Sequence, residues 1–233
     1  MSYLSEFLGV IVLIYLGGSV NANVSLAKTK GHGSGWIVTA VGWAVAVMVP
    51  VMMFERFGGA HFNPAVTLGF AMSGDFEWSK VPGYFAAQLA GGIIGGLLVW
   101  LQFRLHFDAT DDRDVKLGVF ATSPAIRSTA DNFFSEFFTT FLLVFAIIGA
   151  IAAAPVHPGP IGIAGIVLAV GTGLGGTTGY AINPARDLGP RIAYWLAPMK
   201  NKRDPDWGYA WIPVAAPLLG GGFAGLVGMF MFL

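Results

Sequence analysis

Two copies of the tripeptide Asn-Pro-Ala carry the most specific chemistry in the sequence. They are Asn63, Pro64 and Ala65, and Asn183, Pro184 and Ala185. Asparagine is a favoured N-cap, and proline suits the first helical position, where its missing N–H would have no partner. Each tripeptide therefore predicts a helix start whose asparagine oxygen accepts a hydrogen bond from its own helix, which leaves the side-chain NH₂ as a donor. A simple turn is the alternative for one copy, but two copies in matching contexts favour a shared role.

The elements around these tripeptides are apolar enough to lie in a membrane. Of 233 residues, 55% are hydrophobic and 11% are charged, whereas soluble domains carry about 25% charged residues. A transmembrane helix needs about 20 apolar residues. The charge-free stretches, divided where prolines interrupt them, predict six spans, at about 4–27, 36–55, 83–105, 133–153, 161–179 and 208–232. The charged residues 104–127 are predicted to form a polar loop.

Two further apolar pieces, about 60–73 and 181–195, are too short to cross a bilayer, and each carries an Asn-Pro-Ala near its start. A short apolar segment between spans is a candidate re-entrant half-helix, whose backbone must be satisfied by protein or water. The sequence therefore predicts an all-α membrane protein with six transmembrane helices and two half-helices.

An internal repeat relates the two halves of the chain. Ser-Glu-Phe opens the first span at Glu6 and the fourth at Glu136, and residues 59–69 parallel residues 179–189. We expect one channel domain over residues 1–233, with one repeat at about 1–117 and the other at about 130–233. Three spans per repeat force the second to insert upside down, so the half-helices enter from opposite faces and meet near the midplane. Their positive ends and amide donors would then bind permeant oxygens and repel cations and protons.

Charge and composition exclude several other functions. Lys and Arg together number 13, as do Asp and Glu, so the net charge is zero and nothing could neutralise a run of phosphates on a nucleic acid. With no cysteine, a disulfide scaffold is excluded. We find no metal-ligand cluster, nucleotide loop or nucleophile with its base, so we expect neither an enzyme nor a cofactor or metal.

At the repeated motifs the chain resembles the aquaporin superfamily, and within it the glycerol-facilitator branch, the aquaglyceroporins. The resemblance covers nearly the whole chain and rests on residues 61–66, 183–187 and 189–190. It implies a six-helix bundle with two half-helices and a homotetramer in the cell membrane, with one pore per subunit and a cytoplasmic N-terminus. The positive-inside rule conflicts, because ten of the 13 basic residues follow spans one, three and five. We follow the resemblance.

The resemblance also predicts a narrow filter near the outer mouth of the pore. Matching the motif positions places Trp43, Gly171, Tyr180 and Arg186 in it. Water-selective relatives have histidine where Gly171 stands and lack an acid after the arginine, so glycine here and Asp187 are typical of the glycerol branch. Tyr180 departs from the phenylalanine common in bacterial glycerol channels, which leaves the order of solute preference open. Glycerol fits such a filter, since aromatic rings would take its carbon edge and Arg186 its hydroxyls.

Other polar residues have two interpretations each. Glu6 and Glu136 could relay protons in a transporter, but the resemblance favours carboxylates that accept hydrogen bonds from the re-entrant loops. His61 could line the inner vestibule or simply pack there. For Asp187, a place in the positive first turn of the half-helix is preferred over solute contact. His157 is a less favoured candidate for a protonation gate.

These residues predict a passive channel for glycerol and other small uncharged solutes with some water, which excludes ions and protons. A water-selective channel and a channel for protonated lactic acid remain alternatives within the same architecture. A proton-coupled secondary transporter is the alternative from another class. The expected partners are therefore these small neutral solutes and the lipid bilayer.

Overall fold

The computed structural model describes residues 1–152 and 158–232, and the prediction of an all-α membrane fold is confirmed. Within these described residues, five segments are long and apolar enough to cross a bilayer. They contain the long helices α1 (Ser2–Ser25), α2 (Trp36–Gly58), α4 (Val81–Ala109), α6 (Thr129–Ala152) and α10 (Ile212–Phe232). The predicted span at 161–179 is shorter than expected, because α7 (Gly159–Leu174) ends in a turn after 16 residues, about 24 Å of helix.

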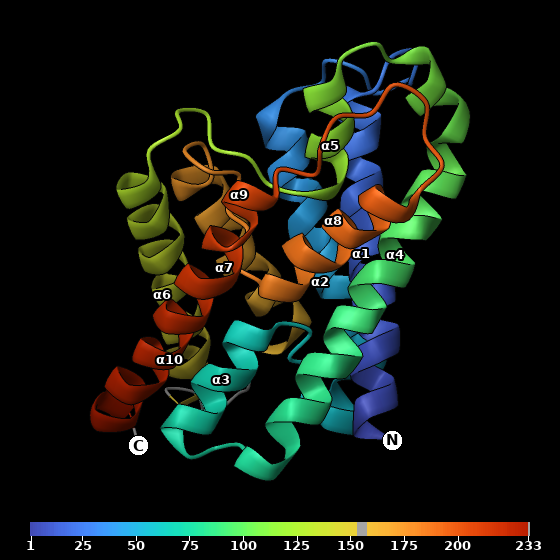
Figure 1. Cartoon of the computed structure of the whole chain (residues 1–233). Helices are drawn as coiled ribbons and strands as arrows, with labels where there is room; N and C mark the ends of the chain where they lie inside the picture. Colours follow the sequence, from blue (N-terminus) through green and yellow to red (C-terminus); the bar gives the residue numbers. More distant parts are fainter. Residues whose placement is uncertain (153–157, 233) are drawn as a thin grey trace.

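Both short apolar pieces form half-helices that begin at the predicted prolines. They are α3 (Pro64–Ser73) and α8 (Pro184–Leu196). In Figure 1, α3 lies in the lower half of the molecule and α8 in the upper half, while both chain ends lie at the bottom. The half-helices therefore approach the middle from opposite sides, as an inverted repeat requires.

Each half-helix packs against a long helix of the other half of the chain. The half-helix α3 packs against α10, and α8 packs against α4. Glycines permit these contacts: a Cβ at Gly225 of α10 would lie 2.1 Å from the carbonyl oxygen of Gly69, and one at Gly92 of α4 would lie 2.6 Å from that of Ala185. Small residues let backbones approach this closely inside a membrane.

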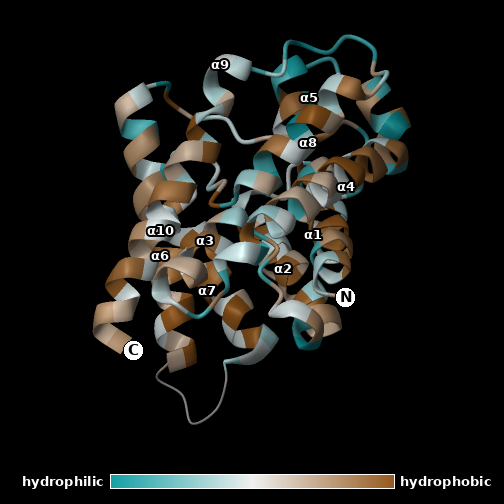
Figure 2. Cartoon of the chain, turned by 60° about the horizontal axis from the view of Figure 1, so that its bottom comes forward, coloured by the Kyte–Doolittle hydropathy of each residue, from teal (hydrophilic) through white to brown (hydrophobic). Residues whose placement is uncertain are grey.

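The outside of the bundle is apolar. Large hydrophobic side chains are exposed on α2, α4, α6 and α10, among them Val41, Leu105, Phe138 and Phe230. Figure 2 shows hydrophobic residues along the long helices, whereas hydrophilic residues gather in the connections at the top. Such a surface is suited to contact with lipid chains.

The polar loop predicted at 104–127 is wrong in part. Helix α4 continues to Ala109, and α5 (Arg113–Phe120) follows after three residues. Asp112 caps α5 by accepting hydrogen bonds from two backbone N–H groups, and Leu117 and Phe120 are buried against the bundle. This segment is rich in charges, but its apolar residues fall on one face of a helix. A helix therefore forms where the overall composition indicates a loop. Two single turns complete the described elements, η1 (Trp78–Lys80) and α9 (Trp207–Ala210).

Candidate pore and its filter

Asn63 and Asn183 cap the two half-helices and join them. The Asn63 Oδ1 accepts a hydrogen bond from the Ala65 N–H at 2.8 Å, and the Asn183 Oδ1 accepts from the Ala185 N–H at 3.0 Å. Each side-chain NH₂ also donates across to the other half: Asn63 Nδ2 lies 2.8 Å from the Ile182 carbonyl oxygen, and Asn183 Nδ2 lies 2.8 Å from that of Phe62. Because an NH₂ group has two hydrogens, one N–H of each asparagine is left for another acceptor.

The loops that lead into α3 and α8 have the same unusual backbone. Ala60 and Phe62 in one loop, and Tyr180 and Ile182 in the other, have positive φ angles between 41° and 52°. This left-handed conformation is costly for residues other than glycine and persists only where neighbouring groups hold it.

Two buried glutamates hold these loops. Glu6 accepts hydrogen bonds from the His61 and Phe62 N–H groups at 2.8 and 2.7 Å. Glu136 accepts from the Ala181 and Ile182 N–H groups at 2.9 and 3.0 Å. Both side chains are fully buried. In each carboxylate both oxygens therefore bind loop backbone, which is the arrangement expected from the resemblance rather than from a proton relay.

The second layer around these glutamates differs between the halves and was not predicted. Gln88 of α4 donates to Glu6 at 2.7 Å and to the Thr67 hydroxyl at 2.9 Å. In the other half, the Thr178 hydroxyl donates to Glu136 at 2.6 Å. The apolar run around Gln88 could have drawn attention to it, because a buried glutamine inside a span needs a polar partner.

Two cavities meet at three side chains. We call the cavity that reaches both asparagines the inner cavity, and the one on the other side of these three side chains the outer cavity. The inner cavity is lined largely by apolar residues such as Val47 and Ile147. The outer cavity is lined by polar and charged residues that include Asn21, Thr39, Arg127 and Asp206. The residues common to both linings are Trp43, Tyr180 and Arg186. The structure thus brings three of the four predicted filter residues to the boundary between the cavities.

The Arg186 guanidinium lies over the Trp43 ring at this boundary. The guanidinium carbon lies 3.9 Å from the centre of the indole ring, a cation–π contact, and one guanidinium nitrogen donates to the Phe120 carbonyl oxygen at 3.2 Å. Both side chains are buried, with 7% and 5% of their surface exposed. An aromatic surface and unused guanidinium donors therefore share one narrow point.

Gly171, the fourth predicted filter residue, lines neither cavity and contacts the filter through Tyr180. A Cβ at this position would lie 2.9 Å from the Tyr180 ring, so the space that the glycine leaves is taken by that ring. Gly171 also accepts a hydrogen bond from the Trp36 indole at 3.0 Å through its carbonyl, and Trp36 meets Tyr180 edge to face. The glycine thus affects the pore through the position of Tyr180.

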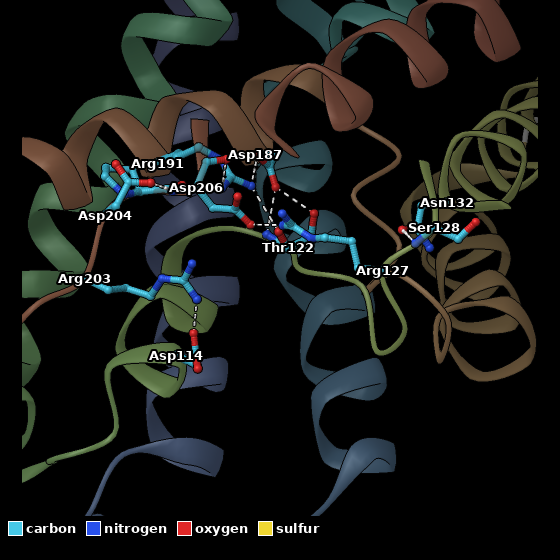
Figure 3. A network of polar contacts seen from close by, with 11 residues as sticks. Asp114, Thr122, Arg127, Ser128, Asn132, Asp187, Arg191, Arg203, Asp204 and Asp206 are labelled. Atoms are coloured by element: carbon cyan, nitrogen blue, oxygen red, sulfur yellow. Dashed lines mark hydrogen bonds and ion pairs between the residues drawn. The ribbon is translucent and has the colours of Figure 1, made fainter. Parts of the chain in front are cut away.

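Asp187 lines neither cavity and belongs to a buried network (Figure 3). Its carboxylate accepts hydrogen bonds from the N–H and the hydroxyl of Thr122, both at 2.7 Å, and pairs with Arg191 at 2.8 Å. Arg191 in turn donates to the carbonyl oxygens of Thr122 and Pro205 at 3.0 and 2.6 Å. This pair ties α8 to the connections on either side of it. Arg191 is one of the ten basic residues that follow spans one, three and five, and its i,i+4 spacing from Asp187 could have revealed the pair.

His61 satisfies both of its interpretations. It lines the inner cavity, and its ring also packs against Phe70, Phe76 and Tyr84. Its Nδ1 lies 3.1 Å from the Thr67 hydroxyl. His157, the candidate protonation gate, lies outside the described residues, as does the end of the predicted span at 153.

Comparison with known proteins agrees with this geometry. A sequence model of the family described as major intrinsic protein matches residues 1–228. The chain belongs to the major intrinsic protein family. Major intrinsic proteins similar to it include the probable glycerol uptake facilitator protein of Thermotoga maritima, 49% identical over 94% of both chains. Glycerol uptake facilitator protein 3 of Lactiplantibacillus plantarum is 48% identical over 97% of this chain and 95% of that protein.

A solved structure within the same family has the same fold. The X-ray structure of the aquaglyceroporin from Plasmodium falciparum matches with a TM-score of 0.87 at 29% sequence identity, over 99% of this chain and 95% of that one. The described helices of this major intrinsic protein therefore have the arrangement of an aquaglyceroporin, and the chain is a multi-pass membrane protein.

Proposed function

We propose that this protein is a passive channel through which glycerol and other small uncharged solutes, with some water, cross the membrane. The observation that carries the proposal is the boundary between the two cavities, where Trp43, Tyr180 and Arg186 meet. The names of the relatives, glycerol uptake facilitators, support the choice of solute.

Glycerol suits this boundary because it has a carbon edge and a hydroxyl edge. The parts of the Trp43 and Tyr180 rings that Arg186 does not cover offer apolar contact, while Arg186 has guanidinium donors beyond the one used on Phe120. Farther into the inner cavity, the remaining N–H of each asparagine offers the next donor. There the apolar wall of the cavity takes over the role of the Trp43 and Tyr180 rings. A solute hydroxyl can therefore exchange one partner for another along its path.

The same path is unfavourable both for cations and for anions. The Arg186 charge and the positive ends of α3 and α8 repel cations. An anion would have to shed its water into a narrow, mostly apolar cavity, which costs more than a few hydrogen bonds return. The same terms oppose transfer of protons as hydronium.

The test is stopped-flow swelling of proteoliposomes that contain the purified protein. We expect glycerol permeability well above that of empty liposomes, and equilibration of labelled glycerol without accumulation when a pH gradient is applied. Glycerol flux at the empty-liposome level would reject the proposal. Fast water flux alone would favour a water-selective channel, and accumulation against the glycerol gradient would favour a proton-coupled transporter.

The finer points of the proposal have separate tests. Lactic acid flux that rises as pH falls, at constant total lactate, would add the protonated acid to the solutes. Native mass spectrometry counts the subunits of the expected homotetramer. The apolar exterior supports residence in a membrane, and both chain ends lie on one side of the bundle. The cell membrane and the cytoplasmic N-terminus of the proposal come from the resemblance to the family.

A further inference from the structure

Asn21 of α1 connects two parts of the pore mouth that are far apart in the sequence. Its Oδ1 accepts a hydrogen bond from the Trp43 indole N–H at 2.9 Å. Its Nδ2 lies 3.3 Å from the Val119 carbonyl oxygen and 3.4 Å from that of Gly118. The side chain is buried, with 9% of its surface exposed, and lines the outer cavity.

The partners of Asn21 fix which way its amide points. An indole N–H can only donate, so it requires the amide oxygen, and backbone carbonyls can only accept, so they require the amide nitrogen. Among side chains of this size, only asparagine offers an acceptor and a donor on one rigid plane. Leucine has neither, and aspartate, which has about the same shape, keeps only the acceptor.

The carbonyls that Asn21 contacts belong to the end of α5. The last carbonyls of a helix lack partners within the helix. In α5, those of Gly118 and Val119 face Asn21, and that of Phe120 accepts from Arg186 at 3.2 Å. One helix end therefore holds the Arg186 guanidinium directly and the Trp43 indole through Asn21.

We propose that Asn21 is a positioning residue of the filter, which fixes the plane of the Trp43 indole against Arg186 and thereby sets the preference for glycerol over water. The inference rests on the proposed function, because it assumes that glycerol passes this boundary. The indole ring lies 3.9 Å from the guanidinium carbon. A ring free to rotate about its side-chain bonds would still leave room for water but would no longer offer glycerol a fixed apolar face.

The experiment compares Asn21→Leu with Asn23→Leu in proteoliposomes. Asn23 lies on the same helix and is exposed, so it controls for the loss of an amide from α1. For Asn21→Leu we expect glycerol permeability to fall about fivefold, the effect of losing one net hydrogen bond, while water permeability changes less than about twofold. For Asn23→Leu we expect both permeabilities to stay at the wild-type value. An unchanged ratio of glycerol to water in folded Asn21→Leu overturns the inference.

Trp43→Phe shows whether Asn21 acts through the indole. If it does, Asn21→Leu adds little to the loss of glycerol preference in the Trp43→Phe background, whereas independent effects multiply. A full additional fivefold loss in the double variant also overturns the inference.

A spectroscopic measurement separates this inference from the proposed function. With ¹⁵N-indole tryptophan, the Trp43 N–H signal, assigned by its absence in Trp43→Phe, should exchange slowly in the wild type and in Asn21→Asp, which keeps the acceptor. It should exchange fast in Asn21→Leu. Equal exchange in wild type and Asn21→Leu rejects the positioning role, and Asn21→Asp provides a second variant should Asn21→Leu not fold. A wild type without glycerol flux rejects the proposed function, and the exchange data then still test the Asn21–Trp43 bond.

Discussion

At the residue scale, the two asparagines combine tasks that are usually separate. Each oxygen caps its own half-helix, and each NH₂ donates to the loop before the other half-helix. The asparagine of each motif is thus held by both halves of the chain, and its remaining N–H has little freedom to turn. A fixed donor in a narrow channel selects for solutes that bring an acceptor of their own.

Asn183→Asp tests this fixed donor. Aspartate can still cap α8, but it cannot donate to the Phe62 carbonyl, and its charge offsets the positive helix ends. We expect glycerol permeability to fall about tenfold or more and sodium leak to rise above the wild-type level. Stopped-flow swelling and a sodium-sensitive dye in the same vesicles measure the two effects. Wild-type glycerol flux in this variant would contradict the role of the donor.

Gly171→Ala tests whether that glycine acts through Tyr180. The added methyl group would lie 2.9 Å from the Tyr180 ring, so the ring must move toward Trp43 and Arg186. Overpacking of this kind costs about 1–3 kcal/mol, and we expect glycerol permeability to fall more than water permeability. Gly173→Ala is the matched control, because a Cβ there meets nothing within 4 Å. An equal fall in glycerol and water permeability would show that Gly171 does not act through Tyr180.

At the element scale, α8 depends on groups that lie outside it. The Asp187–Arg191 pair is fully buried and forms hydrogen bonds to two connections. Thr122 belongs to the connection between α5 and α6, and Pro205 to the one between α8 and α9. The position of α8, and with it that of Arg186, is therefore set by buried polar contacts as well as by its packing against α4.

Arg191→Met should destabilise the protein strongly. Removing one partner of a buried ion pair costs about 3–5 kcal/mol, because the remaining charge is left uncompensated. Lys80→Met removes a partner from the exposed Lys80–Glu77 pair and should cost less than about 1 kcal/mol. Thermal unfolding in detergent compares the two variants. Similar unfolding temperatures for both would show that the buried pair is not needed to hold α8.

The two half-helix starts, and through the resemblance the two glutamates that hold their loops, could be predicted from sequence, whereas the partners farther from the loops could not. Capping by Asn63 and Asn183 is local, so a tripeptide is enough to indicate it. Asn21 and Gln88 bind segments distant in the chain, and Arg191 binds Thr122 and Pro205 in addition to nearby Asp187. The sequence can indicate that such a residue needs a polar partner, but it does not identify the distant one. The helix α5 was missed because charge dominates its composition, while its buried face depends on the rest of the bundle.

At the scale of the whole molecule, the pore has two chemically distinct mouths. The outer cavity is polar and charged, and the inner one is mostly apolar. The chain has no cysteine, so a single introduced thiol can mark one mouth without background.

Thr39→Cys determines which mouth faces outward. Thr39 lines the outer cavity, so a bulky thiol reagent attached there should obstruct the filter. With the N-terminus in the cytoplasm, we expect a membrane-impermeant reagent applied to intact cells to reduce glycerol uptake by the variant by more than half. The wild type, lacking thiols, serves as the control and should be unaffected. If the reagent inhibits glycerol uptake only in inverted vesicles, the protein has the opposite orientation, in agreement with the positive-inside count.

Each half-helix packs against a long helix of the other half of the chain, and this sets an order of events during synthesis. The half-helix α3 is made early, but α10, against which it packs at Gly69 and Gly225, begins only at Ile212. A ribosome adds about 5–20 residues per second, so α3 waits on the order of ten seconds for its partner. During that time the first motif can enter the membrane, but its packing partner is missing. The first half-helix is therefore fixed only after α10 has been made, and a protein truncated before α10 would lack both this helix and a settled first half-helix.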